Sequence, residues 1–206
     1  METDNKEFLK TVLGLYSKYG IKSVTMDDVS RELGISKKTL YTYVSDKNEL
    51  VEKVIDFQCK ERIAWMKSLN LDKLPALEEM VEVGKIINKM VSEFTPTFHY
   101  DLSKYYVKTY KKMMKINRQS MAESMLLNLK KGKKEGFYRQ ELNEEIIVNM
   151  HIANAENLAE IGFYNSQKGN SEEIQRELFS YHLHAILNQK GLEEYNRLIN
   201  SENTKL

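Results

Sequence analysis

The sequence predicts an all-α protein, and three observations support this prediction. Apolar residues recur at helical spacing along most of the 206 residues. Hydroxyl-bearing residues suited to helix caps, such as Thr25 and Ser36, precede several of these stretches. The chain has only two prolines and no sustained alternation of apolar and polar residues, so a sheet is not expected. We expect an N-terminal three-helix helix-turn-helix domain followed by a C-terminal helical domain.

The first predicted helix ends near Gly20. Its apolar residues share one face, which we expect to cover the two helices that follow; they are Phe8, Leu9, Val12, Leu13 and Tyr16.

The second predicted helix begins after Thr25, whose hydroxyl group can cap the first turn. Asp28 stands three residues later, where its carboxylate can complete a capping box. Val29 and Leu33 fall on one face. Gly34 is placed to end this helix in the left-handed conformation.

The third predicted helix is capped by Ser36 and buries Leu40 and Val44. Its outward residues are all cationic or hydroxyl-bearing: Lys37, Lys38, Thr39, Tyr41, Thr42 and Tyr43. Such a surface suits a recognition helix, which needs donors for base edges and for phosphates. Ser45 is expected to cap the next helix, with Lys47 in its first turn as a phosphate ligand.

This region resembles the N-terminal domain of the tetracycline-repressor (TetR) family over roughly Phe8 to Ile55. The residues that carry the resemblance are Gly20, Thr25, Val29, Leu33-Gly34-Ile35-Ser36, Thr39-Leu40-Tyr41, Tyr43 and Lys47-Asn48-Glu49-Leu50. Ser30 and Val44 depart from the family pattern, where alanine and phenylalanine are common. The resemblance implies phosphate contacts from Thr25, Tyr41, Tyr43 and Lys47, and major-groove contacts from Lys37, Lys38, Thr39 and Thr42. With Ser36, these residues form the predicted DNA-binding set; a solvated helix-turn-helix without a DNA role is the alternative.

Composition limits the possible functions. The formal net charge is only +1, so DNA binding must depend on a local surface. The stretch Ser36–Lys47 holds three lysines and one acid, Asp46, and we expect specific binding to need two copies. The single cysteine, Cys59, excludes an internal disulfide and is expected in the core. No signal peptide or membrane-spanning run is visible, so we expect a cytoplasmic protein with no membrane partner.

The remaining chain predicts a series of helices separated by short breaks. We expect a long helix from Ser45 to about Leu69, a break at Asn70–Pro75 and a turn or short helix at Thr97–Asp101. Further helices are expected at about Ala76–Phe94, Leu102–Lys134 (broken by Gly132 and Gly136), Glu144–Ser166, Ser171–Lys190 (stopped by Gly191) and Leu192–Ile199.

We assign residues 1–48 to the DNA-binding domain and residues 49–206 to a ligand-binding and dimerisation domain. The resemblance implies that the second domain encloses a small-molecule pocket and pairs its last two long helices with a second subunit. Aromatic and methionine side chains suit an apolar or amphipathic effector, although the same residues could simply form core. The candidates are Trp65, Phe94, Phe98, Tyr106, Tyr110, Met113, Met114 and Met125.

No catalytic or metal-binding motif appears in the sequence. His182 and His184 are two residues apart, on different faces of a helix, so joint metal ligation is not expected. We therefore expect no enzyme and no cofactor. The predicted function is a homodimeric, sequence-specific DNA-binding transcription regulator, a repressor released from a palindromic operator by a small-molecule effector. The alternative is a helical protein-interaction scaffold with residual DNA binding and no effector.

Overall fold

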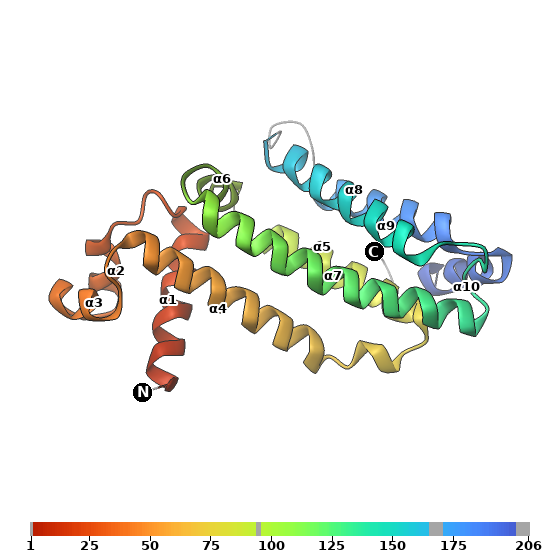
Figure 1. Ribbon diagram of the computed structural model, residues 1–206, viewed down its shortest axis with the longest axis horizontal. Coiled ribbons are helices and arrows are strands. Elements are labelled where there is room, and N and C mark those ends of the chain that lie inside the picture. The colour runs from red at the N-terminus through yellow and green to blue at the C-terminus, as the bar shows by residue number, and fades with distance from the viewer. Residues whose placement is uncertain (1, 94–95, 165–170, 201–206) are drawn as a thin grey trace. The chain divides into compact units, whose positions relative to one another are not determined.

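The computed structural model describes residues 2–93, 96–164 and 171–200, and within these ranges the fold is helical (Figure 1). The helices are α1 (Glu2–Tyr19), α2 (Met26–Glu32), α3 (Lys37–Tyr43), α4 (Lys47–Ser68), η1 (Leu71–Lys73), α5 (Ala76–Glu93), α6 (Pro96–Tyr105), α7 (Val107–Glu135), α8 (Glu144–Tyr164), α9 (Ser171–Ile186) and α10 (Gln189–Asn200). The predicted all-α class is confirmed. No helix of the described part combines the length and the apolar character needed to cross a membrane.

The chain forms two compact units. The first joins the chain up to Met66 with the stretch that ends at Asn117, and the second holds Lys67–Glu93 and the chain from Arg118 onward. The predicted boundary after residue 48 differs from this division, because α4, α6 and the start of α7 pack with α1–α3. That residues 1–48 bind DNA and residues 49–206 bind the ligand and a second subunit stays a prediction.

The first unit has a continuous apolar core. Val12 and Tyr16 of α1 are fully buried, as are Val29 of α2 and Leu40 of α3, as their helical spacing predicts. Cys59 of α4 is also buried in this core, as predicted. Burial of each aliphatic side chain contributes roughly 1.5–3 kcal/mol, so this shared core holds the short helices α2 and α3 in place.

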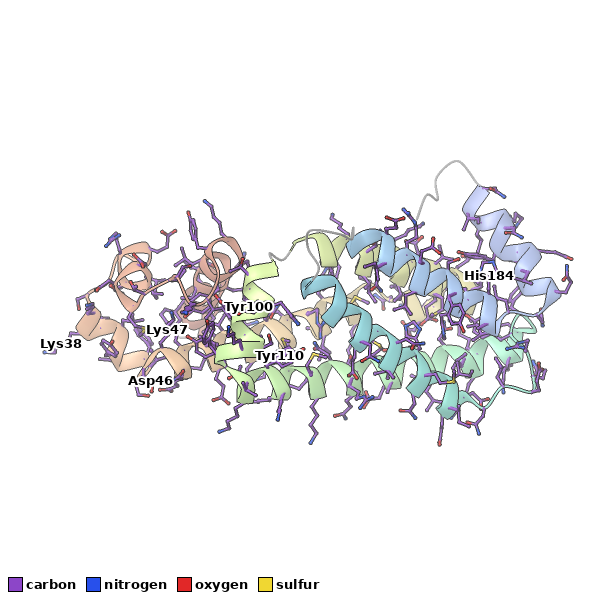
Figure 2. All side chains as sticks on the ribbon, turned by 90° about the horizontal axis from the view of Figure 1, so that it is seen from above. Lys38, Asp46, Lys47, Tyr100, Tyr110 and His184 are labelled. Carbon is purple, nitrogen blue, oxygen red and sulfur yellow. The ribbon has the colours of Figure 1, made fainter. Side chains whose placement is uncertain are left out.

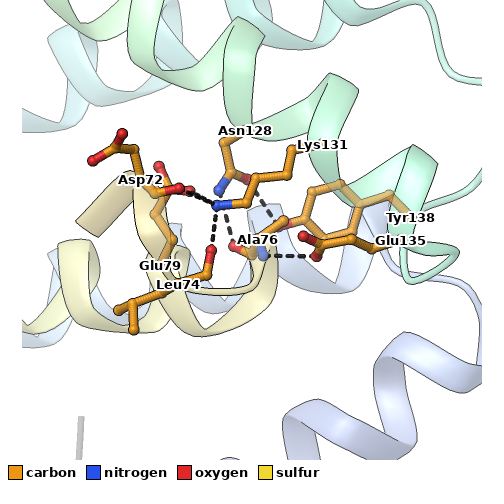
Figure 3. A network of polar contacts seen from close by, with 8 residues as sticks. All are labelled: Asp72, Leu74, Ala76, Glu79, Asn128, Lys131, Glu135 and Tyr138. Atoms are coloured by element: carbon orange, nitrogen blue, oxygen red, sulfur yellow. Dashed lines mark hydrogen bonds and ion pairs between the residues drawn. The ribbon is translucent and has the colours of Figure 1, made fainter. Parts of the chain in front are cut away.

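A polar network fixes the start of α5 against α7 in the second unit (Figure 3). Asn128 and Tyr138 both donate to the Ala76 carbonyl oxygen, at 2.9 and 3.2 Å, and Glu135 accepts from the Ala76 amide at 2.8 Å. Lys131 donates to the Asp72 and Leu74 carbonyl oxygens and pairs with Glu79. The Ala76 amide lies in the first turn of α5, where backbone N–H groups lack a partner within the helix, and Glu135 supplies one.

Two predicted helix boundaries are wrong in the middle of the chain. The long helix begins at Val107 instead of Leu102, which belongs to α6. Gly132 does not break α7, because the Tyr138 ring packs directly on it: a Cβ at Gly132 would lie 2.2 Å from this ring. Gly136, with φ +77°, ends the helix as predicted.

Two further helix ends were also predicted wrongly. Gly191 does not stop the helix that begins at Ser171; α9 ends at Ile186 instead, and Gly191 lies in the first turn of α10. There the Asn188 side chain accepts from the Gly191 amide at 2.9 Å. At the start of α4, Asp46 takes the capping position predicted for Ser45, accepting from the Glu49 amide at 2.9 Å.

Candidate nucleic-acid interface

The helix-turn-helix begins with the predicted capping box. The Thr25 hydroxyl accepts from the Asp28 amide at 3.1 Å, and the Asp28 carboxylate accepts from the Thr25 amide at 2.9 Å. The Thr25 hydroxyl and the Thr25 amide both donate to the Asp28 carboxylate and lower the pKa of Asp28, so the carboxylate stays charged. The Thr25 hydroxyl also donates to Asp28 at 2.6 Å, and it would have to exchange this partner to donate to a phosphate.

The turn between α2 and α3 follows the prediction. Gly34 has φ +65°, and its amide donates to the Arg31 carbonyl oxygen at 3.1 Å. Ile35 is half-buried against the core of the first unit. A left-handed residue costs an L side chain energy that glycine avoids, which explains glycine here.

Helix α3 separates a buried face from an exposed one. Leu40 is fully buried and Val44 nearly so, whereas the six residues predicted to face outward are all exposed. Tyr41 and Tyr43 are 48% and 49% exposed, which is high for aromatic residues. Ser36 accepts from the Thr39 amide at 3.0 Å and caps the helix.

The exposed side chains of α3 differ in the contacts they make. Lys37 forms an ion pair with Asp27 of α2, and the Thr42 hydroxyl donates to the Thr39 carbonyl oxygen at 2.6 Å. The Tyr43 ring stacks on Phe8 of α1 with centroids 5.4 Å apart. Lys38 forms no hydrogen bond or ion pair within the described part of the chain, and Figure 2 labels it on the helix-turn-helix.

Lys47 lies at the first residue of α4, beside the turn that joins α1 and α2 (Figure 2). Its ammonium group donates to the Lys22 carbonyl oxygen at 3.2 Å. Burial lowers the pKa of Lys47, while the negative charges of Asp101 and Asp28 oppose this shift. A half-buried ammonium group at a helix N-terminus can bind a phosphate.

Three contacts of this surface were missed from the sequence. Asp27 pairs with Lys37, Lys53 donates to the Tyr43 carbonyl oxygen at 2.6 Å, and Asp101 accepts from the Lys22 amide. The Asp27–Lys37 and Tyr43–Lys53 contacts each join consecutive helices across ten residues, whereas Asp101 is distant from Lys22 in sequence.

The predicted pocket residues fall in different places. Phe98 and Met113 are buried in the core of the first unit, and Tyr106, Tyr110 and Met114 pack against it. Met125 belongs to the core of the second unit, and Trp65 is 45% exposed. Phe94 lies outside the described residues. The assignment of these residues to one pocket remains a prediction.

The second unit has a small hollow at Gly84, Asn88, Gln175, Arg176 and Phe179. Its volume of about 10 Å³ fits about one water molecule and no larger ligand. Within the described residues, no three histidine, cysteine, aspartate or glutamate side chains converge to hold a metal ion.

A short helix packed behind an exposed, capped helix of lysines and hydroxyls defines a helix-turn-helix protein. Residues 9–54 match the family model described as bacterial regulatory proteins, tetR family. The match lies over the helix-turn-helix, within the part of the chain where the sequence resemblance to this family was found.

One curated relative is similar to about half of the chain. The uncharacterized HTH-type transcriptional regulator YvaF of Bacillus subtilis (strain 168) is 31% identical over 109 residues. The match covers 47% of this chain and 55% of the relative, so the chain spans about half the length of that protein.

Solved structures share the fold over most of the chain. A transcriptional regulator from Cytophaga hutchinsonii has a TM-score of 0.70 at 14% identity, covering 88% of this chain and 97% of its own. SmeT, the repressor of the Stenotrophomonas maltophilia multidrug efflux pump SmeDEF, has a TM-score of 0.63 at 10% identity, with 90% and 91% covered. A regulator from Saccharomonospora viridis in complex with choline has a TM-score of 0.64 at 15% identity, with 92% and 100% covered. At these identities the similarity shows the fold alone.

Proposed function

We propose that this protein is a sequence-specific DNA-binding transcription regulator without enzymatic activity, acting in the cytoplasm. One observation carries the proposal: every predicted base-reading residue of α3 is exposed while its apolar residues are buried. A structural helix of this length would not need six exposed cationic and hydroxyl side chains. Lysines and hydroxyls at this density suit phosphates and base edges of duplex DNA.

We further propose that the protein acts as a homodimer on a palindromic operator. Helix α8 exposes Ile146 and Met150, one turn apart, and α9 exposes Tyr181. Because α8 and α9 pack against each other, these side chains can form one apolar face for a second copy. Two copies would present two α3 helices to half-sites ~34 Å apart.

The regulatory part of the proposal is a repressor released by a small apolar or amphipathic molecule. It is supported by the family resemblance and by the aromatic and methionine content of the predicted pocket residues. Among proteins of the same fold, one is named as a repressor and another is in complex with choline. Such an effector must bind the DNA-competent and DNA-incompetent states with different affinities.

A gel shift with the DNA that flanks the protein's own coding region tests the proposal. At ~150 mM salt, non-specific phosphate binding is suppressed, and a specific complex should survive excess unrelated DNA. The alternative, a helical scaffold with residual DNA binding, predicts a complex that unrelated DNA removes at the same concentration. Loss of the complex when Lys38 and Tyr41 are both changed to alanine would assign the binding to α3.

A further inference from the structure

The backbone of Lys22 joins α6 to the start of α4. Its amide donates to the Asp101 Oδ2 atom at 2.7 Å, and its carbonyl oxygen accepts from the Lys47 ammonium group at 3.2 Å. Asp101 is only 4% exposed. One residue between α1 and α2 therefore connects a buried carboxylate of α6 with the lysine proposed to contact phosphate.

Gly20 allows the carboxylate to approach this turn. Gly20 has φ +82°, and a Cβ atom there would lie 3.1 Å from Asp101 Oδ2 and 2.8 Å from Thr97 Cγ2. Helix α6 thus packs directly on the backbone of Gly20. The Ser23 hydroxyl also donates to the Tyr19 and Gly20 carbonyl oxygens, so these two backbone groups of the turn have hydrogen-bond partners as well.

The side chain of Lys22 does not share the role of its backbone. Its ammonium group donates to the Tyr105 hydroxyl at 3.0 Å and lies 4.3 Å from the Tyr105 ring centroid. Asp101 therefore acts on the turn through the Lys22 amide. A hydrogen bond to a buried charged acceptor is stronger than one between neutral groups.

We propose that Asp101 is a positioning residue for the DNA interface, which fixes the Lys22 peptide group and thereby holds Lys47 in place to contact phosphate. This inference rests on the proposed function. It also assigns a role to α6, which contributes no residue to the helix-turn-helix.

The first test needs no DNA. Amide hydrogen exchange of Lys22 is compared by NMR in the wild type, Asp101→Ala, Asp101→Asn and the control Asp56→Asn. Asp56 is a carboxylate of the same unit, paired with Lys112 instead of the turn. We expect exchange at Lys22 to accelerate about tenfold or more in Asp101→Ala, less in Asp101→Asn, which keeps a neutral acceptor, and not in the control. Unchanged exchange at Lys22 in both Asp101 variants would overturn the proposal.

The second test measures operator affinity in a double-mutant cycle of Asp101→Ala and Lys47→Ala. If Asp101 acts through Lys47, each single change weakens binding about tenfold and the double variant is hardly weaker than Lys47→Ala. If the loss of operator affinity in the double variant equals the product of the two single losses, Asp101 does not act through Lys47, and the proposal is overturned. Wild-type protein that binds no DNA would instead contradict the proposed function, while the exchange experiment still decides whether Asp101 fixes the turn. Thermal melting curves of Asp101→Asn and the wild type check that both proteins are folded under the conditions of the two tests.

Discussion

The ammonium group of Lys37 in α3 lies 2.5 Å from the Asp27 carboxylate in α2. Both side chains are more than half exposed, so the pair contributes at most about 1 kcal/mol to stability. The pair does, however, give a defined position to a lysine that we propose reads a base edge. On binding, Lys37 would exchange the Asp27 carboxylate for an acceptor on the DNA.

Replacing Lys37 by alanine should change base preference. A side chain that reads a base edge contributes about 1–3 kcal/mol of discrimination, whereas a phosphate contact favours no sequence. Competition binding with operators altered one base pair at a time measures this difference. We expect relaxed discrimination at one position of each half-site. Equal weakening on every duplex would place Lys37 on phosphate instead of in the groove.

Replacing Lys47 by alanine should weaken binding to all duplexes almost equally. Removing one phosphate contact should also reduce the slope of log K against log salt concentration by about one. Titrations at several salt concentrations test this prediction. Lys60→Ala is a matched control, because Lys60 is an exposed lysine on the same helix. A slope identical to that of the wild type would show that Lys47 does not contact a phosphate.

Much of the helix-turn-helix could be predicted because its signals are local. The Thr25–Asp28 capping box, the left-handed Gly34 and the buried Leu40 each follow from a few adjacent residues. The partner of Lys22 could not be predicted in this way, since Asp101 is 79 positions along the chain.

Glycines caused two of the wrong helix boundaries, for a physical reason. Gly132 and Gly191 resemble helix breakers in sequence, but both lie inside helices where another group packs against the backbone. At Gly132 this group is the Tyr138 ring, and at Gly191 it is the Phe137 carbonyl oxygen. Their need for glycine depends on tertiary contacts that the sequence pattern does not reveal.

Replacing Gly132 by alanine should therefore destabilise the protein. A Cβ atom 2.2 Å from the Tyr138 ring forces the ring to move, and overpacking of this kind costs about 1–3 kcal/mol. Gly14→Ala is the control, because a Cβ there has no neighbour within 4 Å. In the helix α1 that change should stabilise by up to about 1 kcal/mol. Urea unfolding measures both changes, and the same sign for the two variants would contradict the packing argument.

The stability of the second unit should fall in mild acid because of two buried histidines. The rings of His151 and His182 lie 4.2 Å apart, and burial lowers their pKa values to about 4 and about 3. Below the usual pKa of 6.5 the unfolded chain binds protons that the folded chain does not, so the free energy of unfolding decreases as the pH falls. At pH 5 each histidine costs about 2 kcal/mol.

Replacing His182 by leucine should remove the acid-induced loss of stability that this histidine causes. Between pH 7 and pH 5 the variant should lose about 2 kcal/mol less stability than the wild type. Urea unfolding at the two pH values provides the measurement, and the exposed His184, replaced in the same way, is the control. An unchanged pH dependence in His182→Leu would show that this histidine is not kept neutral by burial.

Disrupting the apolar face of α8 should produce monomers. Met150→Lys places a charge where we propose that a second copy packs, and a buried unpaired charge strongly disfavours association. Leu127→Lys, at an exposed residue of α7, is the control for a general loss of solubility. Sedimentation equilibrium should show monomers for Met150→Lys and dimers for the control and the wild type. A dimer that survives Met150→Lys would place the interface elsewhere.

The most direct test of the central claim is selection of bound duplexes from a random-sequence library by the intact protein, followed by sedimentation of the selected complex. If two copies present α3 to neighbouring grooves, the enriched duplex contains inverted half-sites with centres ~34 Å apart, and the complex contains two subunits. Enrichment of no sequence, or a selected duplex that binds a single chain, would contradict this account.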